Sequence, residues 1–443
     1  MGLVYWFLAL IGIGTVLLWL PPSGATEGFT PLLTALFTAT SAATNTGLVT
    51  QDASTYWSFF GQAVILGLIF TGGLGLLTGA GFLLLVAGQR IGLQNLLVLR
   101  EGMGGELGSL RRLLISFVVV SIVLQLSGAA VLFVRFYVSD MLWPGISAPE
   151  AAWMAVFHSV SAFNNGGIDI FRNDLVGGDS VSGLRTDYIL LGVLASLIVL
   201  GGFGYLVLHD IGSARRFNRL QLNTKVVLVG SVALVLGGAG VFLAQSWRDP
   251  GTLGPAGTGE KVAAALFDSI AARTAGYNAI DYSQAPGDRL VSAEMLMLVG
   301  GASASAAGGL KVNTTMVVAL AVFAAVRGRR HVTAFKREIP DVTVLRAMVV
   351  VVTSFMLLGV FLLALTRVQG DLPFRAMLFE LVSAFGTVGL SAGITPQLNT
   401  AAQLIIISVM FLGKFGPLTL MLFMVGREEP EKFRPAEEAV RIG

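Results

Sequence analysis

Long apolar runs alternate with polar segments along this chain, and eight of the runs are long enough to form membrane-spanning helices. A helix that crosses the hydrocarbon core of a bilayer needs about 20 mostly apolar residues. The runs occupy residues 3–20, 57–87, 113–136, 188–208, 226–245, 290–326, 344–365 and 402–425. The first run has neither the basic start nor the small-residue cleavage site of a signal peptide, so we expect it to be retained as a helix. The pattern therefore predicts an all-α polytopic membrane protein with eight transmembrane helices.

The composition supports a membrane protein and excludes several other classes. The 443 residues are 54% hydrophobic and 12% charged, with a mean hydropathy of +0.78, whereas roughly a quarter of the residues in soluble domains are charged. A cytosolic enzyme, a nucleic-acid-binding protein and a disordered chain are therefore excluded. The sequence has no cysteine and three scattered histidines, so neither a thiolate nor a histidine metal site is expected.

Basic residues are concentrated on one side of the predicted membrane. If the N-terminus is inside, the inner segments are 89–112, 210–225, 327–346 and 427–443, and they hold 18 of the 29 Lys and Arg residues. The outer segments, 21–56, 137–187, 247–294 and 367–400, hold 8. This asymmetry follows the positive-inside rule and places both termini in the cytoplasm. It also accounts for the basic pI near 9.3 without a nucleic-acid partner.

Each outer segment contains an apolar stretch of about 12–15 residues that is too short to cross the membrane and runs into a tetrad of residues ending in glycine. The tetrads are Thr44-Asn45-Thr46-Gly47, Asn164-Asn165-Gly166-Gly167, Arg273-Thr274-Ala275-Gly276 and Gly386-Thr387-Val388-Gly389. Their last glycines are 120, 109 and 113 residues apart, and a serine precedes three of them by six residues (Ser41, Ser161 and Ser383). This spacing predicts one unit, a helix, a re-entrant pore helix, a glycine loop and a helix, repeated four times in one orientation.

The four tetrads are the candidate ion pathway. Irregular backbone at membrane depth occurs only where it lines a water-filled cavity or is buried in protein. Glycine leaves the path free of side chains, and carbonyl oxygens replace the water around a cation. We therefore expect a selectivity filter that binds potassium ions, with no structural metal, at Thr44, Asn45, Thr46, Gly47, Asn164, Asn165, Gly166, Gly167, Thr274, Ala275, Gly276, Gly386, Thr387, Val388 and Gly389. Glycines that only pack helices together are the alternative, which four aligned tetrads disfavour.

Charged side chains near the tetrads need their own explanation. Arg273 lies inside the third tetrad, where a cation facing the path would repel potassium, so we expect it to point behind the loop with Asp268 or Glu294 as its partner. His158, Asp268 and Glu380 lie in the short helices, and we expect polar contacts that hold these helices to their neighbours. The alternative for the two carboxylates is a negative potential that concentrates cations at the outer mouth.

At these residues the sequence resembles the Trk/Ktr/HKT superfamily of potassium transporters, and the resemblance covers nearly the whole chain. Besides the tetrads, it rests on four stretches of the inner helices: 71–78 (TGGLGLLT), 201–205 (GGFGY), 300–315 (GGASASAAGGLKVNTT) and 413–419 (GKFGPLT). The third loop, Arg273 to Tyr277, is the most characteristic. The length of the chain favours the Ktr-type membrane subunit over the longer Trk type.

The resemblance implies a homodimer in the plasma membrane, with one pseudo-fourfold pore in each chain. The pore-loop repeats would span 1–88, 112–212, 222–328 and 341–426, followed by a cytoplasmic tail at 427–443. A separate polypeptide would supply a cytoplasmic ring of nucleotide-binding regulatory subunits. We therefore expect potassium as the substrate, with sodium dependence left open, no cofactor in this chain, and a nucleotide only on the regulatory partner.

A run of very small residues interrupts the sixth apolar run. From Gly300 to Gly309 it contains four Gly, four Ala and two Ser, and glycine is about 1 kcal/mol less favourable than alanine inside a helix. The run predicts a helix break at 300–311, and the resemblance implies a mobile loop that gates the pore; close helix packing is the alternative. The expected gate residues are Gly300, Gly301, Ser303, Ser305, Gly308, Gly309, Lys311 and Lys414.

Lys414 is the most unusual charge in the sequence. It lies about twelve residues into the last apolar run, roughly 18 Å from the outer end of a helix that rises 1.5 Å per residue. A lysine at that depth is costly unless it faces water, a carboxylate or carbonyl oxygens. We therefore expect it to face the pore or the small-residue run. The superfamily commonly has an arginine at this position.

The predicted function is potassium-selective uptake across the cell membrane. The alternative is a secondary transporter of another small solute, which would have inverted repeats and charges near the midplane. An enzyme would need convergent acid, base or metal-binding residues within the spans. The sequence offers no such set, so we expect no enzymatic activity.

Overall fold

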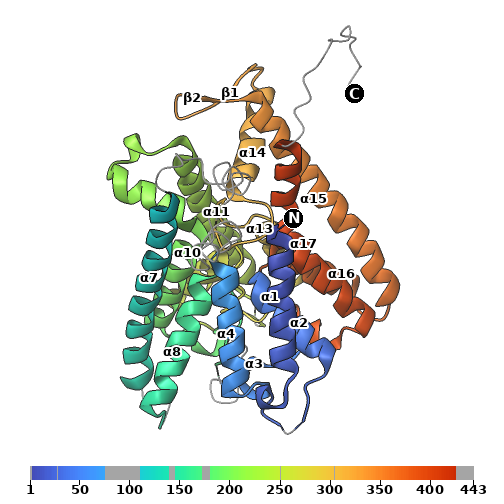
Figure 1. Ribbon diagram of the computed structural model, residues 1–443. Coiled ribbons are helices and arrows are strands. Elements are labelled where there is room, and N and C mark those ends of the chain that lie inside the picture. Colours follow the sequence, from blue (N-terminus) through green and yellow to red (C-terminus); the bar gives the residue numbers. More distant parts are fainter. Residues whose placement is uncertain are drawn as a thin grey trace.

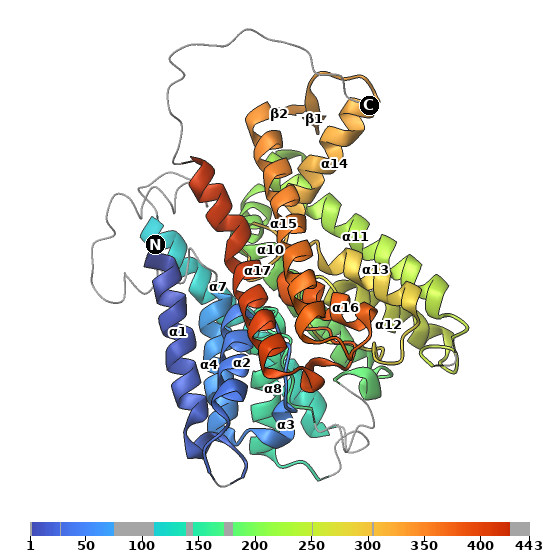
Figure 2. The ribbon, with the colours of Figure 1, turned by 90° about the vertical axis from the view of Figure 1, so that its right-hand side faces the viewer.

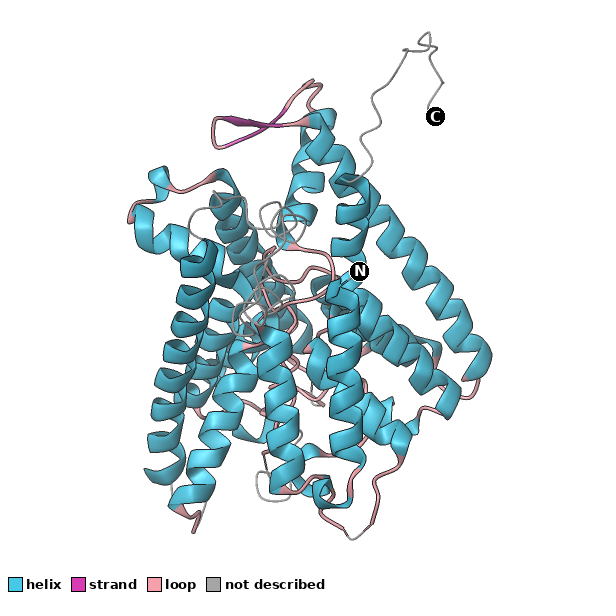
Figure 3. Cartoon of the chain, viewed as in Figure 1, coloured by secondary structure: helices cyan, strands magenta, loops and turns pink. Residues whose placement is uncertain are grey.

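The computed structural model describes residues 2–26, 28–74, 110–138, 145–171, 180–249, 251–303 and 305–425. Three segments for which the sequence makes predictions lie outside these residues: the inner end of the second apolar run, most of the inner segment 89–112, and the tail 427–443. The described chain is mostly helical, with one pair of short strands (Figure 3). The predicted fold class, an all-α polytopic protein, is confirmed.

The helices follow the order of the apolar runs. The first group is α1 (Gly2–Trp19), α2 (Leu32–Thr44), the single turn α3 (Ala53–Tyr56) and α4 (Phe59–Gly73). The second is α7 (Leu110–Val138), α8 (Ala148–Phe163) and α10 (Tyr188–Ala214). The third is α11 (Leu222–Ser246), α12 (Thr258–Ala271), α13 (Gly287–Met297) and α14 (Val312–Val326). The fourth is α15 (Asp341–Val368), α16 (Phe374–Gly386) and α17 (Thr400–Val425).

Helix length separates possible membrane spans from the short helices. Within the described residues, α7 from Ile115 onward, α10, α11 and α15 are long and apolar enough to cross a membrane. By contrast, α2, α8, α12 and α16 have 13, 16, 14 and 13 residues, and a helix of that length reaches only about 20–24 Å. These four helices coincide with the short apolar stretches that precede the tetrads.

Contacts between the four groups close a ring. Each short helix packs against the long helix before it, in the pairs α1–α2, α7–α8, α11–α12 and α15–α16. Each also packs against an inner helix of the preceding group, in the pairs α4–α8, α10–α12, α13–α16 and α17–α2. The last pair joins the end of the chain to its beginning, so the four groups surround one axis (Figures 1 and 2).

The short helices form the centre of this ring. One phenylalanine in each is at most 2% exposed: Phe37, Phe157, Phe267 and Phe379. Apolar side chains on the outer helices are exposed instead, as Val131 of α7 (48%) and Leu363 of α15 (73%) illustrate. Large exposed apolar faces are typical of membrane contact. The burial pattern is therefore that of helices packed inside a lipid-facing shell.

The two ends of the ring differ. Strands β1 (Val332–Ala334) and β2 (Arg337–Ile339) pair antiparallel and extend from one end, beside α14 and α15, whereas α3 lies at the other end (Figure 1). Loops gather between the helices in the middle of the molecule (Figure 3). The tetrads that follow the short helices are among these central loops.

The sixth apolar run forms two helices, because α13 ends at Met297 and α14 starts at Val312. We call residues 300–309 between them the small-residue loop. Its ends are joined by backbone hydrogen bonds: Gly300 N donates to Leu310 O over 2.8 Å, and Val312 N donates to Gly301 O over 3.1 Å. The segment therefore leaves the helix axis and returns to it as a closed loop.

Candidate functional site

The last glycines of the four tetrads meet at the axis of the ring. A Cβ atom built on Gly47 would lie 2.8 Å from the Cα of Gly167, and one built on Gly276 would lie 2.7 Å from the same atom. A Cβ built on Gly389 would lie 3.0 Å from the Cα of Gly47 and 3.1 Å from that of Gly276. Real Cβ atoms hardly ever approach another atom to less than 3.0 Å. No side chain fits at these positions without moving the backbone of a neighbouring tetrad.

The nearest oxygens around these glycines belong to the third residue of the next tetrad. A Cβ built on Gly47 would lie 3.0 Å from Gly166 O, and one built on Gly167 would lie 3.1 Å from Ala275 O. One built on Gly276 would lie 2.7 Å from Val388 O. A Cβ built on Gly389 would collide with Thr46 O, which closes the cycle. The carbonyl oxygens of Thr46, Gly166, Ala275 and Val388 therefore each lie beside the last glycine of a neighbouring tetrad, in cyclic order.

All four tetrads have a left-handed backbone at the same two positions. The last glycines have φ of +94°, +66°, +75° and +96° in chain order, a left-handed region that glycine enters without steric cost. The second residue of each tetrad also has a positive φ: Asn45 (54°), Asn165 (53°), Thr274 (81°) and Thr387 (48°). Left-handed non-glycine residues are uncommon, so their presence at the same position four times indicates that one loop design is repeated.

Serines of the short helices hold the loops in this conformation. Gly47 N donates to Ser41 Oγ over 3.0 Å, and Gly389 N donates to Ser383 Oγ over 3.1 Å. In the second loop, Ser161 Oγ donates to Ile168 O over 2.7 Å. In the third loop, Ser269 is shifted by one residue and donates to Val235 O of α11 instead. The serine spacing in the sequence therefore marks a support for the loop backbone in three of the four repeats.

A second set of supports lies just beyond the glycines. His158, Asp268 and Glu380, which are at most 1% exposed, each accept a hydrogen bond from the backbone N–H three residues after the last glycine. The donors are Ile170 (3.2 Å), Ala279 (2.7 Å) and Ala392 (3.1 Å). The structure thus favours the polar contact expected from the sequence over the alternative of carboxylates facing the outer mouth.

The buried ion pair between Asp268 and Arg289 was not predicted from the sequence. The two side chains are fully buried, with Arg289 Nη2 2.9 Å from Asp268 Oδ2. Arg289 also stacks on Phe242 of α11, 3.6 Å from the ring centroid, and donates to Ser246 Oγ. The pair joins α13 to α12 and thereby fixes the helix that carries the third tetrad.

The expected partner of Arg273 was wrong. Asp268 pairs with Arg289, and the Nη2 group of Arg273 donates to Ser231 Oγ over 3.2 Å and to Gly300 O over 3.3 Å. Both acceptors are neutral. The guanidinium therefore lies behind the third loop, between α11 and the start of the small-residue loop.

Two side chains at the second tetrad position bond either the small-residue loop or the lysine that binds it. Thr387 Oγ1 accepts from Gly308 N over 2.9 Å, and Asn45 Oδ1 accepts from Lys414 Nζ over 3.1 Å. Lys414 also donates to Ala306 O, and Lys311 donates to Ala307 O. Two ammonium groups from α17 and the start of α14 therefore bind adjacent carbonyls of the loop.

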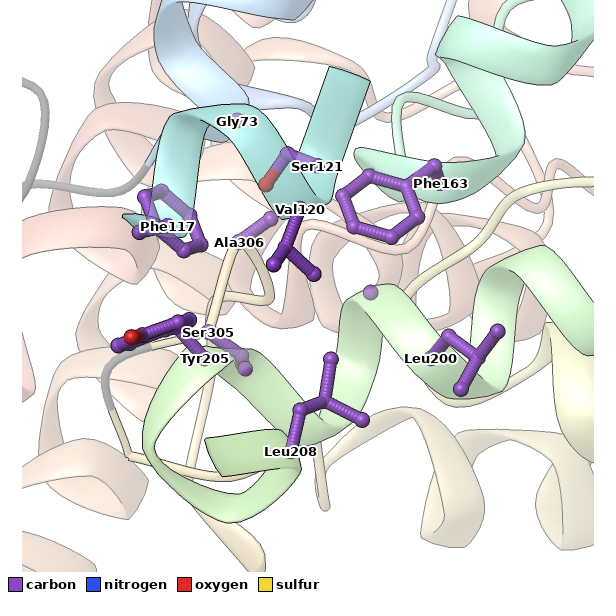
Figure 4. A pocket seen from close by; sticks show the side chains of 12 residues that line it. Gly73, Phe117, Val120, Ser121, Phe163, Leu200, Tyr205, Leu208, Ser305 and Ala306 are labelled. Atoms are coloured by element: carbon purple, nitrogen blue, oxygen red, sulfur yellow. The ribbon is translucent and has the colours of Figure 1, made fainter. Parts of the chain in front are cut away.

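The rest of the small-residue loop packs against the inner helices. Ser305 and Ala306 line a small pocket with Phe117 of α7 and Tyr205 of α10 (Figure 4). Ser303 N donates to Asn313 Oδ1 over 3.0 Å, and Gly309 N donates to Gly413 O over 3.1 Å. Every expected gate residue except Ser305 thus has a hydrogen bond given above.

Glycines of the inner helices permit close approach to the short helices. A Cβ on Gly72, Gly201 or Gly413 would collide with a backbone oxygen at the end of the short helix of its own group: Ala43 O, Phe163 O or Phe385 O. Each oxygen lies four residues before the last glycine of the tetrad. These glycines belong to the stretches that carry the family resemblance. In the third group, α13 stops at Met297, so the small-residue loop takes the place of this helix contact.

The first residues of the first two tetrads bond back to their own helices. Thr44 Oγ1 lies 2.7 Å from Thr40 O and 2.7 Å from Thr46 Oγ1, and Asn164 Nδ2 donates to Val160 O over 2.8 Å. Their side chains therefore support the loops. In the described part of the chain, no cluster of three or more His, Asp or Glu residues could hold a metal ion.

Comparisons with known proteins agree on one family. A profile of the family described as TrkH, cation transport protein, matches residues 1–433. The chain is 36% identical to Ktr system potassium uptake protein B of Bacillus subtilis, covering 99% of this chain and 95% of that protein. It is 34% identical to potassium/sodium uptake protein NtpJ of Enterococcus hirae, covering 99% and 95%. The crystal structure of the potassium transporter TrkH from Vibrio parahaemolyticus superimposes with a TM-score of 0.70 at 16% identity, over 97% of this chain and 84% of that chain, which shows the shared fold.

Proposed function

Because the chain belongs to the TrkH family of cation transport proteins, we propose that it carries potassium into the cell through the ring of tetrad carbonyls. Relatives that match nearly the whole chain are named as potassium uptake proteins of Ktr systems. Potassium uptake is accordingly the function of this chain, and it is not an enzyme. The roles of individual residues are the proposal.

The filter consists of the four tetrads. Potassium loses water as it passes the carbonyl oxygens of Thr46, Gly166, Ala275 and Val388, and these oxygens take the place of the lost ligands. Helices α2, α8, α12 and α16 end at the tetrads, so their C-terminal partial negative charges add to the attraction for a cation. The cyclic order of glycine and carbonyl contacts is the observation that supports this assignment most directly.

The gate is the small-residue loop with its two lysines. Lys414 and Lys311 bind the carbonyls of Ala306 and Ala307, and Thr387 links the loop to the fourth tetrad. A positive charge beneath the filter opposes the passage of a cation, and the loop narrows the path. Opening would require these hydrogen bonds to break, which gives a regulatory partner a small set of contacts to act on.

The proposal also covers the membrane location, the oligomeric state and the regulatory partner of the chain. The protein is multi-pass in the plasma membrane with both termini in the cytoplasm, forms a homodimer, and works with a separate ring of nucleotide-binding subunits. Two observations support the separate subunits and the cytoplasmic side: the Ktr relatives are named as parts of a system, and basic residues gather on the face of the β1–β2 hairpin, where Arg329, Arg330 and Arg337 are exposed. Since one relative is named as a potassium/sodium uptake protein, sodium dependence is included in the test.

Cation flux in proteoliposomes tests the function. Purified protein is reconstituted, and uptake of rubidium is measured in competition with potassium, sodium and lithium, with and without internal sodium. We expect potassium to compete strongly and lithium weakly, because the carbonyl ring is matched to a large monovalent cation. Equal competition by all the cations, or flux no higher than in protein-free liposomes, would overturn the proposed filter.

A further inference from the structure

A cavity of about 200 Å³ lies between α10 and α11, behind the third tetrad. Its walls include the apolar side chains of Phe203, Val232 and Leu236. Val232 and Leu236 are 54% and 62% exposed, so the cavity opens on the outer surface of α11, a helix that is long enough to span the membrane. Asn165, which is 1% exposed, lies at its closed end. The cavity is thus a side opening from the lipid toward the back of the filter.

The closed end of this cavity has polar groups without partners. Arg273 and Asn165 both line it, and neither Arg273 Nε nor Asn165 Oδ1 has a hydrogen-bond partner. The other contacts of Arg273 are with the neutral acceptors Ser231 Oγ and Gly300 O. Among the residues that the structure describes, no carboxylate lies within ion-pair distance of Arg273; the nearby Asp268 is paired with Arg289. A positive charge removed from water without a counter-ion is strongly unfavourable.

We propose that this cavity binds a long-chain fatty acid. The carboxylate accepts hydrogen bonds from the guanidinium of Arg273 and supplies the missing negative charge, because a planar guanidinium and a carboxylate form strong paired bonds. The alkyl chain lies along Phe203, Val232 and Leu236 and leaves through the opening into the bilayer. A phospholipid is less suited, since its charged headgroup stays at the membrane interface, whereas a fatty acid has a small polar end that the cavity can hold.

The position of this site connects it to transport. Arg273 belongs to the third tetrad and donates to Gly300 O at the start of the small-residue loop. A carboxylate bound to Arg273 competes with that carbonyl for the same guanidinium. Occupation therefore changes a contact between filter and gate, a consequence that rests on the proposed function. The binding itself does not rest on the proposed function, so it is tested without any measurement of transport.

The location is tested by blocking the opening. Binding of oleate to the purified full chain in detergent is titrated by native mass spectrometry, with oleyl alcohol as a probe that has the same chain and no charge. In Val232→Trp the indole fills the opening; Val241→Trp places the same change on an exposed position of the same helix that does not line the cavity. We expect one saturable oleate site per chain, weakened at least tenfold in Val232→Trp and unchanged in Val241→Trp.

The role of the fatty-acid carboxylate is tested by replacing Arg273, its proposed partner. Arg273→Gln should weaken oleate at least tenfold and leave oleyl alcohol unchanged, and wild type should prefer oleate to oleyl alcohol. Equal binding of the two probes would overturn the role of Arg273, and equal oleate binding in the two tryptophan variants would overturn the location. Absence of saturable binding in wild type would overturn the site as a whole. If Arg273→Gln fails to fold, the tryptophan pair and the two probes still decide.

Discussion

Lys414 Nζ donates a hydrogen bond of 3.1 Å to Asn45 Oδ1, although the two residues are 369 positions apart in the sequence. The amide of Asn45 in turn donates to Ile69 O of α4 over 2.8 Å. Because Lys414 also binds Ala306 O, one buried ammonium group connects the last helix, the first tetrad and the small-residue loop. A change at Lys414 therefore affects the loop and the filter together.

Replacement of Lys414 tests whether its positive charge opposes the passage of potassium. Lys414→Ala removes the charge and both hydrogen bonds, so we expect a several-fold higher potassium flux in proteoliposomes. Lys414→Arg keeps the charge and adds donors that fit several carbonyls, so flux should stay at or below the wild-type level. Lower flux in a well-folded Lys414→Ala protein would mean that the charge supports the open state.

The four last glycines give a prediction about selectivity. A serine at Gly47, Gly167, Gly276 or Gly389 places a Cβ against a carbonyl or Cα of the next tetrad and requires a left-handed backbone that serine adopts poorly. We expect each variant to lose potassium affinity or about tenfold of its discrimination against sodium. Gly240→Ser of α11 is the control, because a Cβ there meets no atom within 4 Å. Wild-type transport by all four variants would contradict the filter assignment.

Shortening the small-residue loop separates gating from packing. Deletion of residues 303–305 shortens the loop between Gly300 and Gly308, which already lie against each other, so less of the loop is left under the filter. We expect higher flux and weaker regulation in protein that still folds. Folded protein with unchanged flux would rule out a gating role, and a loss of folded protein at normal flux per molecule would indicate a packing element.

Glu380 gives a prediction about the segment after the fourth tetrad. Its carboxylate accepts from Ala392 N over 3.1 Å and from Thr395 Oγ1 over 3.0 Å, and it also binds Ser391. Glu380→Ala leaves these donors buried without acceptors, at a cost of about 1–3 kcal/mol for each unsatisfied group. Thermal unfolding of purified protein should show a clearly lower midpoint for Glu380→Ala, and a smaller decrease for Glu380→Gln, which retains one acceptor. Equal midpoints for wild type and the alanine variant would show that the contact adds no stability.

Breaking the Asp268–Arg289 pair should lower the stability of the protein strongly, and removing both charges should restore most of it. Asp268→Asn leaves a buried guanidinium without its counter-charge, which typically costs about 3–5 kcal/mol. The double variant Asp268→Asn/Arg289→Met removes both charges and should recover most of the loss. His331 and Glu338 provide a control, since their side chains are 63% and 59% exposed and Glu338→Gln should cost about 1 kcal/mol or less. Unfolding midpoints compare the variants, and an absence of rescue would mean that the pair is not the source of the effect.

Several features of this fold were accessible from the sequence because they depend on local patterns. Apolar runs of about 20 residues identify spans whatever their neighbours are, and the run Gly300–Gly309 predicts a break between α13 and α14 from helix propensity alone. The positions of His158, Asp268 and Glu380, nine, eight and nine residues before the last glycine, were a visible signal for the shared support behind the filter. The donor of each hydrogen bond, the backbone N–H three residues after the last glycine, could not be identified from the sequence, because it is a backbone group.

Contacts that depend on how helices rotate against each other were not accessible. Arg289 lies outside every motif, and only the packing of α12 and α13 against α11 brings it to Asp268. Arg273 was assigned a carboxylate partner from charge alone, whereas its neighbours in the structure are a serine of α11 and a carbonyl of the loop. Spacing along one chain predicts which residues share a helix, and it does not predict which side chains meet across the ring.

The cyclic contacts of the tetrads have a consequence for how the filter can vary. The four walls are encoded at four separate places in one gene, so one mutation alters a single wall and leaves three intact. The third residues already differ, being Thr46, Gly166, Ala275 and Val388. A channel built from four identical chains receives every substitution four times over. Here, one substitution changes only one of the four walls, so selectivity can be adjusted one wall at a time. Both natural variation and engineering can therefore produce an asymmetric filter.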